Sequence, residues 1–480
     1  LASITIPDGV TSIGSYAFCG CSSLASVTIG GDTSIGDDAF SGCTGLEELV
    51  IGNSVTSLDR GEFYGCSSLT SIVVAEGNKA YCSVDGVLFS KDMKMLVQYP
   101  AGRPDDSYVI PDSVTSIGTY AFRECSSLAS ITIPDSVTSI GQYAFGDCTG
   151  LKELTIPISV NAVGSNSYPT FSGCTNIEKV TFTPGTGKGY DYGDSSSSCY
   201  TPWYYSRAVL KEVVIEDGVT SIGNEAFYGC SFLASITIPD GVTSIGSYAF
   251  CRCSSLVSVT IPDSVTFIGN EAFRGCPSLA SITIPDGVTS IGSYAFFDCF
   301  SLASVTIPDS VTSIGHAAFF ECFPLASVTI PDSVTSIGSS AFYRCTGLKE
   351  IVIGNGVTSI GDSAFEKCTS LVSVTIPDSV TSIGNEAFYG CSSLTSVTIP
   401  DSVTSICYWA FRECSSLTSV TIPDSVTYLG ICAFYGCSSL TSIILPDSVT
   451  SIDYAAFDGC TAVSSIRIGP DISSIGNRAF

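Results

Sequence analysis

The chain has a single histidine, His316, and most catalytic arrangements of nucleophile and base would have to use it. A Ser-His-Asp or Cys-His site pairs the imidazole with a nucleophile, because proton transfer needs titratable groups in unlike surroundings. Equivalent segments of the chain carry Asn, Ser, Asp or Gln at this position, which indicates an exposed residue. The sequence contains no phosphate-binding loop, paired zinc histidines or dinucleotide fingerprint. We therefore expect no enzyme activity and no cofactor.

The 23 cysteines are the other reactive groups. Seventeen of them follow an aromatic residue by three positions, and from Cys230 to Cys460 they recur every 23 residues. Such residues form a column that does not converge on one point, so we expect buried, reduced thiols without a metal. Parallel side chains in a column also have poor disulfide geometry. Cys82 and Cys199 are the predicted exposed or bridging thiols among the six outside the column, which also include Cys19, Cys251, Cys407 and Cys432.

Aspartate also recurs once per unit, from Asp240 to Asp332 and again from Asp378 to Asp447. An Asp in a turn commonly bonds the local backbone, and this is the first interpretation of the column. A weak, salt-sensitive Ca²⁺ stripe is the alternative, although each turn supplies one carboxylate and Ca²⁺ takes about six or more oxygens. No metal site is therefore predicted.

These columns come from a 23-residue repeat, in which the aromatic slot after Ala recurs without exception from Phe227 to Phe480. The unit that begins at Leu394 has the L-x-x-L-x-L spacing of leucine-rich repeats. Alternation over Leu394–Ile399 predicts a short parallel strand with apolar residues on one side and Ser and Thr on the other. A turn and a second extended piece, Val403–Ile406, follow. We expect a short helical or 3₁₀ segment around Ala410 and Phe411 to close the coil.

The same spacing extends through the irregular first half, where Tyr99 and Tyr204 fill the aromatic slot. The sequence therefore predicts one continuous leucine-rich-repeat horseshoe of about 20 coils over residues 1–480. Two coils carry insertions on the same side: residues 75–98 read as a hairpin added to coil four, and residues 183–203 form a Gly/Ser/Tyr-rich insertion in coil eight. Because Leu1 and Phe480 both fall within a repeat, we expect any export signal or anchor to lie outside these 480 residues.

The composition excludes several classes of partner. The formal net charge is −26, which repels nucleic-acid phosphates and anionic lipids. Hydrophobic residues make up 45% of the chain, enough for a large core, but no run is long enough to insert into a membrane. The regular Ser and Thr columns also allow an ice-binding or mineral-binding surface, although the strand propensity of Thr explains them equally well.

Candidate contact residues lie in the two insertions, because rings and charges on protruding loops suit recognition of proteins or sugars. Trp203 and Tyr204 coincide with the Ala-Phe slot, so we expect them in the core, with a contact role as the alternative for Trp203. Tyr190, Tyr192 and Tyr200 are therefore the better contact candidates. Sequence variation is otherwise concentrated in the two residues before Ala-Phe and the two before Cys, where extra aromatics occur. The candidate partner-binding residues are Tyr190, Tyr192, Tyr200, Trp203, Tyr205, Lys91 and Lys94.

The unit S-V-T-I-P-D-S-V-T-S-I-G-x-x-A-F-x-x-C resembles the BspA-like, Treponema-type leucine-rich repeats, and the resemblance covers nearly the whole chain. It implies an exported protein at the cell surface or outside the cell. It also implies a role in adhesion, through binding of an extracellular protein or glycan from a host or another microbe. A structural spacer without a ligand of its own is the alternative function.

Overall fold

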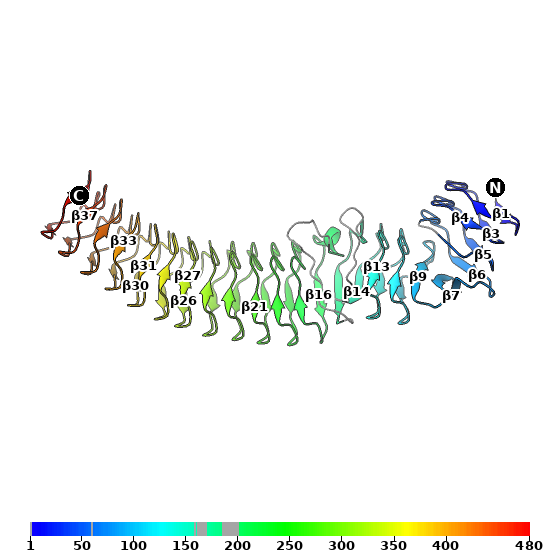
Figure 1. Ribbon diagram of the computed structural model, residues 1–480, viewed down its shortest axis with the longest axis horizontal. Helices are drawn as coiled ribbons and strands as arrows, with labels where there is room; N and C mark the ends of the chain where they lie inside the picture. The colour runs from blue at the N-terminus through cyan, green and yellow to red at the C-terminus, as the bar shows by residue number, and fades with distance from the viewer. Residues whose placement is uncertain (1, 59–60, 158–159, 161–169, 185–200) are drawn as a thin grey trace. The chain divides into compact units, whose positions relative to one another are not determined.

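The computed structural model describes residues 2–58, 61–157, 160, 170–184 and 201–480. Its internal contacts divide the chain into two compact units, Leu1–Thr220 (unit 1) and Ser221–Phe480 (unit 2). Both units consist of parallel strands that follow one another coil by coil (Figure 1). The expected parallel-strand solenoid with a period of about 23 residues is confirmed, with about 19 turns close to the predicted 20. Continuity of the solenoid from one unit into the other stays a prediction.

Each coil contributes a first strand of three to five residues, whose apolar side chains point inward. First strands pair in parallel with the equivalent residues of the next coil, as Val328 does with Ile351. In unit 1 they are β1 (Ser3–Ile6), β3 (Ser26–Ile29), β5 (Glu48–Ile51), β6 (Ser71–Val74), β10 (Ser107–Val109), β12 (Ser130–Thr132), β14 (Glu153–Pro157), β15 (Lys179–Thr183) and β16 (Glu212–Ile215). In unit 2 they are β18 (Ser235–Thr237), β20 (Ser258–Thr260), β22 (Ser281–Thr283), β24 (Ser304–Thr306), β26 (Ser327–Ile330), β28 (Glu350–Ile353), β30 (Ser373–Thr375), β32 (Ser396–Thr398), β34 (Ser419–Thr421), β36 (Ser442–Ile444) and β38 (Ser465–Arg467).

A second strand, usually of two residues, follows the Pro-Asp turn and forms another parallel ladder. In unit 1 these strands are β2 (Ser12–Ile13), β4 (Ser34–Ile35), β9 (Met95–Gln98), β11 (Ser116–Ile117) and β13 (Ser139–Ile140). In unit 2 they are β17 (Ser221–Ile222), β19 (Ser244–Ile245), β21 (Phe267–Ile268), β23 (Ser290–Ile291), β25 (Ser313–Ile314), β27 (Ser336–Ile337), β29 (Ser359–Ile360), β31 (Ser382–Ile383), β33 (Ser405–Ile406), β35 (Tyr428–Leu429), β37 (Ser451–Ile452) and β39 (Ser474–Ile475).

The core is a set of columns, and the aromatic slot forms its centre. Phe319, Phe342 and Phe365 are fully buried, and Phe342 stacks on the other two rings with centroids 5.2 and 5.4 Å apart. Offset stacking adds to the free energy of burying each ring. A coil therefore depends on both neighbours for its core, as expected of a solenoid.

The prediction of a helical segment at the end of each coil is wrong. The stretch around Ala-Phe consists of turns, and η1 (Tyr204–Ser206) is the one helical element among the described residues. Most coils place a residue at positive φ on each side of Ala-Phe, such as Tyr294 (φ 58°) and Asp298 (φ 60°). Left-handed residues interrupt helical geometry. The backbone bonds instead alternate between the coil itself and the next one, as in Phe342 N to Ala364 O at 2.8 Å.

The cysteine column lies beside the aromatic column. The Cys322 thiol donates to the carbonyl of Phe296 at 3.3 Å, and the equivalent contact recurs in most coils. All described cysteines are free thiols. Burial raises the pKa of Cys322 well above its ordinary value, which keeps the thiol protonated. These residues therefore act as small core side chains that also satisfy a backbone carbonyl.

Residues 75–98, interpreted from the sequence as an added hairpin, contain antiparallel strands. Strands β7 (Tyr81–Val84) and β8 (Val87–Ser90) pair antiparallel, and β8 also pairs antiparallel with β9. Strand β9 is at the same time the second strand of coil four, because it pairs in parallel with β11. The insertion therefore extends the second ladder of unit 1, in the order β13-β11-β9-β8-β7.

Candidate interaction surface

The open face of the first strands in unit 2 is chemically uniform. Ser and Thr side chains such as Ser304 and Thr306 point outward and are exposed. Val352 and Ile444 are the exposed apolar substitutions in this array. A uniform hydroxyl surface offers little that would select one partner.

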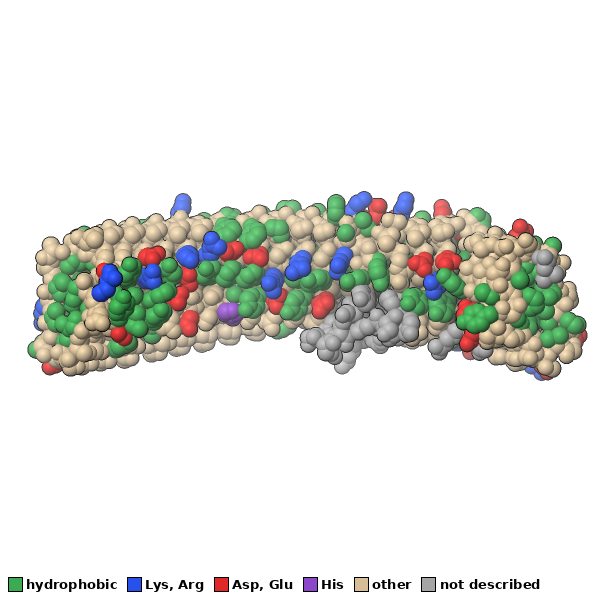
Figure 2. Space-filling model, turned by 90° about the horizontal axis from the view of Figure 1, so that it is seen from above, with side chains coloured by type: hydrophobic (Ala, Val, Ile, Leu, Met, Phe, Trp, Pro, Cys, Tyr) green, Lys and Arg blue, Asp and Glu red, His purple; other side chains and the backbone are tan. Residues whose placement is uncertain are grey.

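Variety is found at the turns around Ala-Phe. The left-handed residues before and after this pair reverse the chain, so that the Phe side chain lies inside while the following residue lies at the surface. Figure 2 shows hydrophobic, basic and acidic side chains gathered in a band on one face, between surfaces formed by other side chains. We call one series of these residues in unit 2 the aromatic–cation stripe. Its members follow the slot Phe by one position, or by two at Lys367: Arg274, Phe297, Phe320, Tyr343, Lys367, Tyr389, Arg412 and Tyr435.

Each residue of the stripe contacts its counterpart in the next coil. Phe320 stacks between Phe297 and Tyr343, with centroids 4.5 and 4.4 Å apart. In coils without a ring at this position, a basic side chain contacts the rings of the neighbouring coils. The Lys367 ammonium lies 5.9 Å from the centroid of the Tyr343 ring and 5.4 Å from that of the Tyr389 ring. Stacking and cation–π contacts each contribute about 0.5–1 kcal/mol at such half-exposed sites. The stripe is therefore an ordered surface whose rings already hold one orientation.

Arg412 is the centre of the last part of the stripe. Its guanidinium lies 4.2 Å from the Trp409 ring, 4.9 Å from the Tyr435 ring and 5.4 Å from the Tyr389 ring. The side chain keeps 22% of its surface exposed, and Tyr408 beside it is exposed as well. An arginine between aromatic rings and open to solvent on one side is a common composition at protein interfaces.

Acidic side chains balance several of the cations. Glu271 accepts from both Arg274 and the Tyr248 hydroxyl at 2.6 Å, and the latter bond raises the pKa of Tyr248 to about 12. The buried Glu366 pairs with Lys367 at 3.5 Å. These pairs fix the positions of the long basic side chains, which lowers the conformational entropy that a partner would have to remove.

The residues predicted to contact a partner are placed differently from one another. Lys91 and Lys94 are exposed at the end of the hairpin, where the Lys91 ammonium reaches the Glu76 carbonyl at 3.5 Å. Tyr205 is 38% exposed. Tyr190, Tyr192 and Tyr200 lie outside the described residues, so their role stays a prediction. The described members of this set therefore lie in two different parts of the chain, the hairpin of coil four and the segment 203–205 of coil eight.

Trp203, one of the candidate contact residues, lies in the core. Its side chain is only 1% exposed and packs edge-on against Phe182 at 5.2 Å, so it belongs to the core and is not a contact residue. The half-buried Tyr204, which was expected in the core slot, lies instead under the Arg207 guanidinium at 4.4 Å. The larger indole takes the buried position because it covers more apolar surface.

The histidine and the turn aspartates that were considered for chemistry lie at the surface. His316 is exposed and contacts the Tyr294 ring edge-on at 4.9 Å. The Asp332 carboxylate accepts from the backbone of Asn355 in the next coil at 2.6 Å, a structural role close to the one expected. Within the described ranges, no group of three His, Cys, Asp or Glu side chains could hold a metal, and no helix is long and apolar enough to cross a membrane.

Comparison with known proteins places this architecture. A family model for the BspA type leucine-rich repeat region matches residues 1–86, 106–191, 200–323, 266–395 and 381–480. The chain belongs to the BspA-type leucine-rich repeat family. Strands β8 and β9 lie outside these ranges, consistent with an insertion into a BspA-type coil. Among curated proteins, none matches the chain.

Solved structures of bacterial leucine-rich repeat proteins are similar to this BspA-type chain. A leucine-rich repeat protein from Bacteroides ovatus is 31% identical, and the match covers 82% of this chain and 88% of that protein, with a TM-score of 0.50. A leucine rich cell surface protein from Faecalibacterium prausnitzii is 30% identical over 72% of this chain and 95% of that protein, with a TM-score of 0.35.

Proposed function

We propose that this BspA-type protein acts at the cell surface as an adhesion module, without catalysis, and that the aromatic–cation stripe of unit 2 binds another extracellular protein. The observation that supports this proposal is the continuity of the stripe. Its rings and cations touch one another from Arg274 to Tyr435, while the strand face of the same coils carries repeated hydroxyls.

The composition of the stripe favours a protein partner. Tyr, Trp and Arg are the residues that most often dominate the binding free energy of protein interfaces. Eight coils at about 4.8 Å per strand give a surface roughly 34 Å long, which is sufficient for an interface of standard size. Membership of the BspA-type family supports surface display, because the resemblance to this family implies an exported protein. The hairpin lysines and the insertion tyrosines remain proposed additional contacts.

A binding screen with matched variants tests the proposal. Arrays of extracellular proteins and of glycans would be probed with the wild-type chain, with a Tyr343→Ser/Arg412→Ser variant, and with Thr329→Ala/Thr398→Ala as a control. The control changes exposed strand-face residues of the same two coils. We expect at least one protein to bind the wild type and the control but not the stripe variant.

Other outcomes would redirect or overturn the proposal. Stripe-dependent binding to glycans alone would replace the protein by a sugar. Binding that survives unchanged in the stripe variant would move the site to another face, and no binding at all would support the spacer alternative.

A further inference from the structure

The hairpin of coil four interrupts the regular stacking of unit 1. In regular coils the second strands pair directly, as Ile13 does with Ile35, and Ile35 in turn bridges to Leu58 of coil three. The next neighbour of Leu58 is the hairpin, since the Leu58 amide donates a hydrogen bond to the Tyr81 hydroxyl oxygen at 2.9 Å. Strands β7 and β8 therefore stand on the side of β9 where coil three would otherwise continue the ladder.

This interruption opens the aromatic column. Phe40 stacks on Phe63 at 6.0 Å and Tyr99 on Phe122 at 5.1 Å, but among the described rings no stacking joins Phe63 to Tyr99. The backbone shows the same break: the Tyr99 amide donates to Ala121 at 2.8 Å, whereas no equivalent bond from Phe63 to Gln98 is present in the described chain. Coils three and four therefore leave a space between their aromatic slots.

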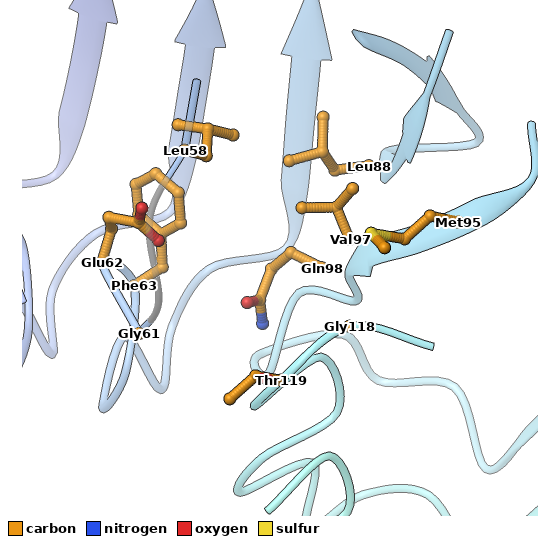
Figure 3. Close-up of a pocket in the computed structure, with 10 residues that line it drawn as sticks. All are labelled: Leu58, Gly61, Glu62, Phe63, Leu88, Met95, Val97, Gln98, Gly118 and Thr119. Atoms are coloured by element: carbon orange, nitrogen blue, oxygen red, sulfur yellow. The ribbon is translucent and has the colours of Figure 1, made fainter. Parts of the chain in front are cut away.

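The two residues that border this space depart from the repeat in a matched way. The residue before the aromatic slot is alanine in the neighbouring coils, as at Ala39 and Ala121, but it is Glu62 in coil three and Gln98 in coil four. Glu62 is only 4% exposed. Figure 3 shows both side chains extending toward the space from the coils on either side. Thr170 of coil seven is the other described polar residue at this position, but its hydroxyl donates to the Gly141 carbonyl at 3.2 Å. Glu62 and Gln98 are the pair in successive coils, on the two sides of the hairpin.

The space is a pocket of about 230 Å³. Besides Glu62 and Gln98, its walls include Phe63, Leu88 and Val97, which are apolar. The volume lies between the roughly 150 Å³ cavity that accepts benzene and the roughly 300–1,000 Å³ pockets of drug-sized ligands. A ligand of this pocket is therefore small, with a short apolar body.

The polar wall offers acceptors. The Gln98 amide nitrogen donates to the carbonyls of Tyr99 at 2.9 Å and Ala121 at 3.3 Å, so the amide oxygen is the Gln98 atom left to face the pocket. Glu62 contributes carboxylate oxygens, which accept hydrogen bonds and carry negative charge when ionised. Two acceptors on facing walls require a ligand that brings several donors, and a primary ammonium has three.

We propose that this pocket is a binding site for a small primary amine with a short alkyl or aryl chain. The ammonium donates to Glu62 and to the Gln98 amide oxygen, and the chain packs against Phe63, Leu88 and Val97. The site lies in unit 1 and does not depend on the stripe or on any partner of unit 2.

The test compares three probes of equal length on the full chain: hexylammonium, 1-hexanol and hexanoate. Isothermal titration calorimetry is expected to show binding of hexylammonium, with 1-hexanol at least about tenfold weaker and hexanoate undetectable. Glu62→Ala and Gln98→Ala restore the alanine of the neighbouring coils, so the repeat itself supports their folding. We expect each to weaken hexylammonium binding, Glu62→Ala by at least about tenfold. Glu48→Ala, an exposed residue of β5, is the control and should bind as the wild type does.

Three results would overturn the proposal: no heat with hexylammonium, equal binding of 1-hexanol, or unchanged binding in Glu62→Ala. If Glu62→Ala does not give the wild-type circular dichroism spectrum, Glu62→Gln keeps the side-chain size while it removes the charge. The same loss is then expected, and an unchanged affinity would equally refute the site.

Discussion

Phe342 and Tyr343 are adjacent in the sequence but have opposite structural roles, and this contrast gives a quantitative prediction. Phe342 is fully buried and stacks on both neighbouring slot rings. Replacing a buried Phe by Ala costs about 3–5 kcal/mol, and the loss of two stacked partners places Phe342→Ala at the upper end of that range. Tyr343 is half-buried and loses mainly its stack on Phe320, so Tyr343→Ala should cost about 1 kcal/mol.

Urea unfolding followed by tryptophan fluorescence measures this difference. Trp409 lies in unit 2 and Trp203 in unit 1, so a Trp203→Phe background isolates the signal of unit 2. We expect a large fall in the urea midpoint for Phe342→Ala and a small one for Tyr343→Ala. Coils are stabilised mainly by their neighbours, so hydrogen exchange should locate the damage around Phe342. Equal losses for the two variants would refute the assignment of one residue to the core and the other to the stripe.

Three further predictions concern the thiols, a carboxyl group and the second insertion. Iodoacetamide at about pH 8 should alkylate the exposed Cys19 but not Cys322, because burial raises the pKa of the Cys322 thiol. Peptide mass spectrometry that finds Cys322 labelled in the native protein would contradict this. Burial, and then the Glu321 carboxylate, raise the pKa of Asp298, so its ionised form disfavours folding above its ordinary pKa. Asp298→Asn should therefore stabilise unit 2 at neutral pH by a few tenths of a kcal/mol after solvent screening, and this gain should vanish below about pH 3; urea midpoints that fall at neutral pH would oppose it. Trp203→Ala should lower the free energy of unfolding of unit 1 by about 3–5 kcal/mol, whereas Tyr205→Ala should change it by less than about 0.5 kcal/mol. Thermal melts that show similar losses for the two variants would contradict the core position of Trp203.

The sequence predicted the strands and columns well because a fixed period leaves little freedom. Residues one period apart must be neighbours if the strands stack, so the burial of Phe342 and Cys322 could be inferred without coordinates. Turn conformation was predicted poorly. Tyr294 and Arg344 adopt left-handed backbone angles (φ 58° and 55°) that non-glycine residues rarely take, so their residue types gave no sign of it.

The candidate sites depend on contacts between coils, which the sequence shows only in part. Variation before and after Ala-Phe is visible in the sequence, but the continuity of the stripe follows from the stacking of Phe297, Phe320 and Tyr343 across coils. The replacement of alanine by Glu62 and Gln98 is visible in the sequence. The sequence does not show that these two residues line one pocket, because this follows only from the position of the hairpin in the folded structure.

Radical footprinting of the bound chain is the most direct test of the central claim. The partner found on the array would be added to the full chain, and hydroxyl-radical oxidation of each side chain would be measured by mass spectrometry with and without it. We predict that Tyr343, Tyr389 and Tyr435 lose most of their oxidation when the partner binds, while Tyr16, which is 62% exposed in unit 1, keeps it. Unchanged oxidation of the three stripe tyrosines in a saturated complex would contradict the account.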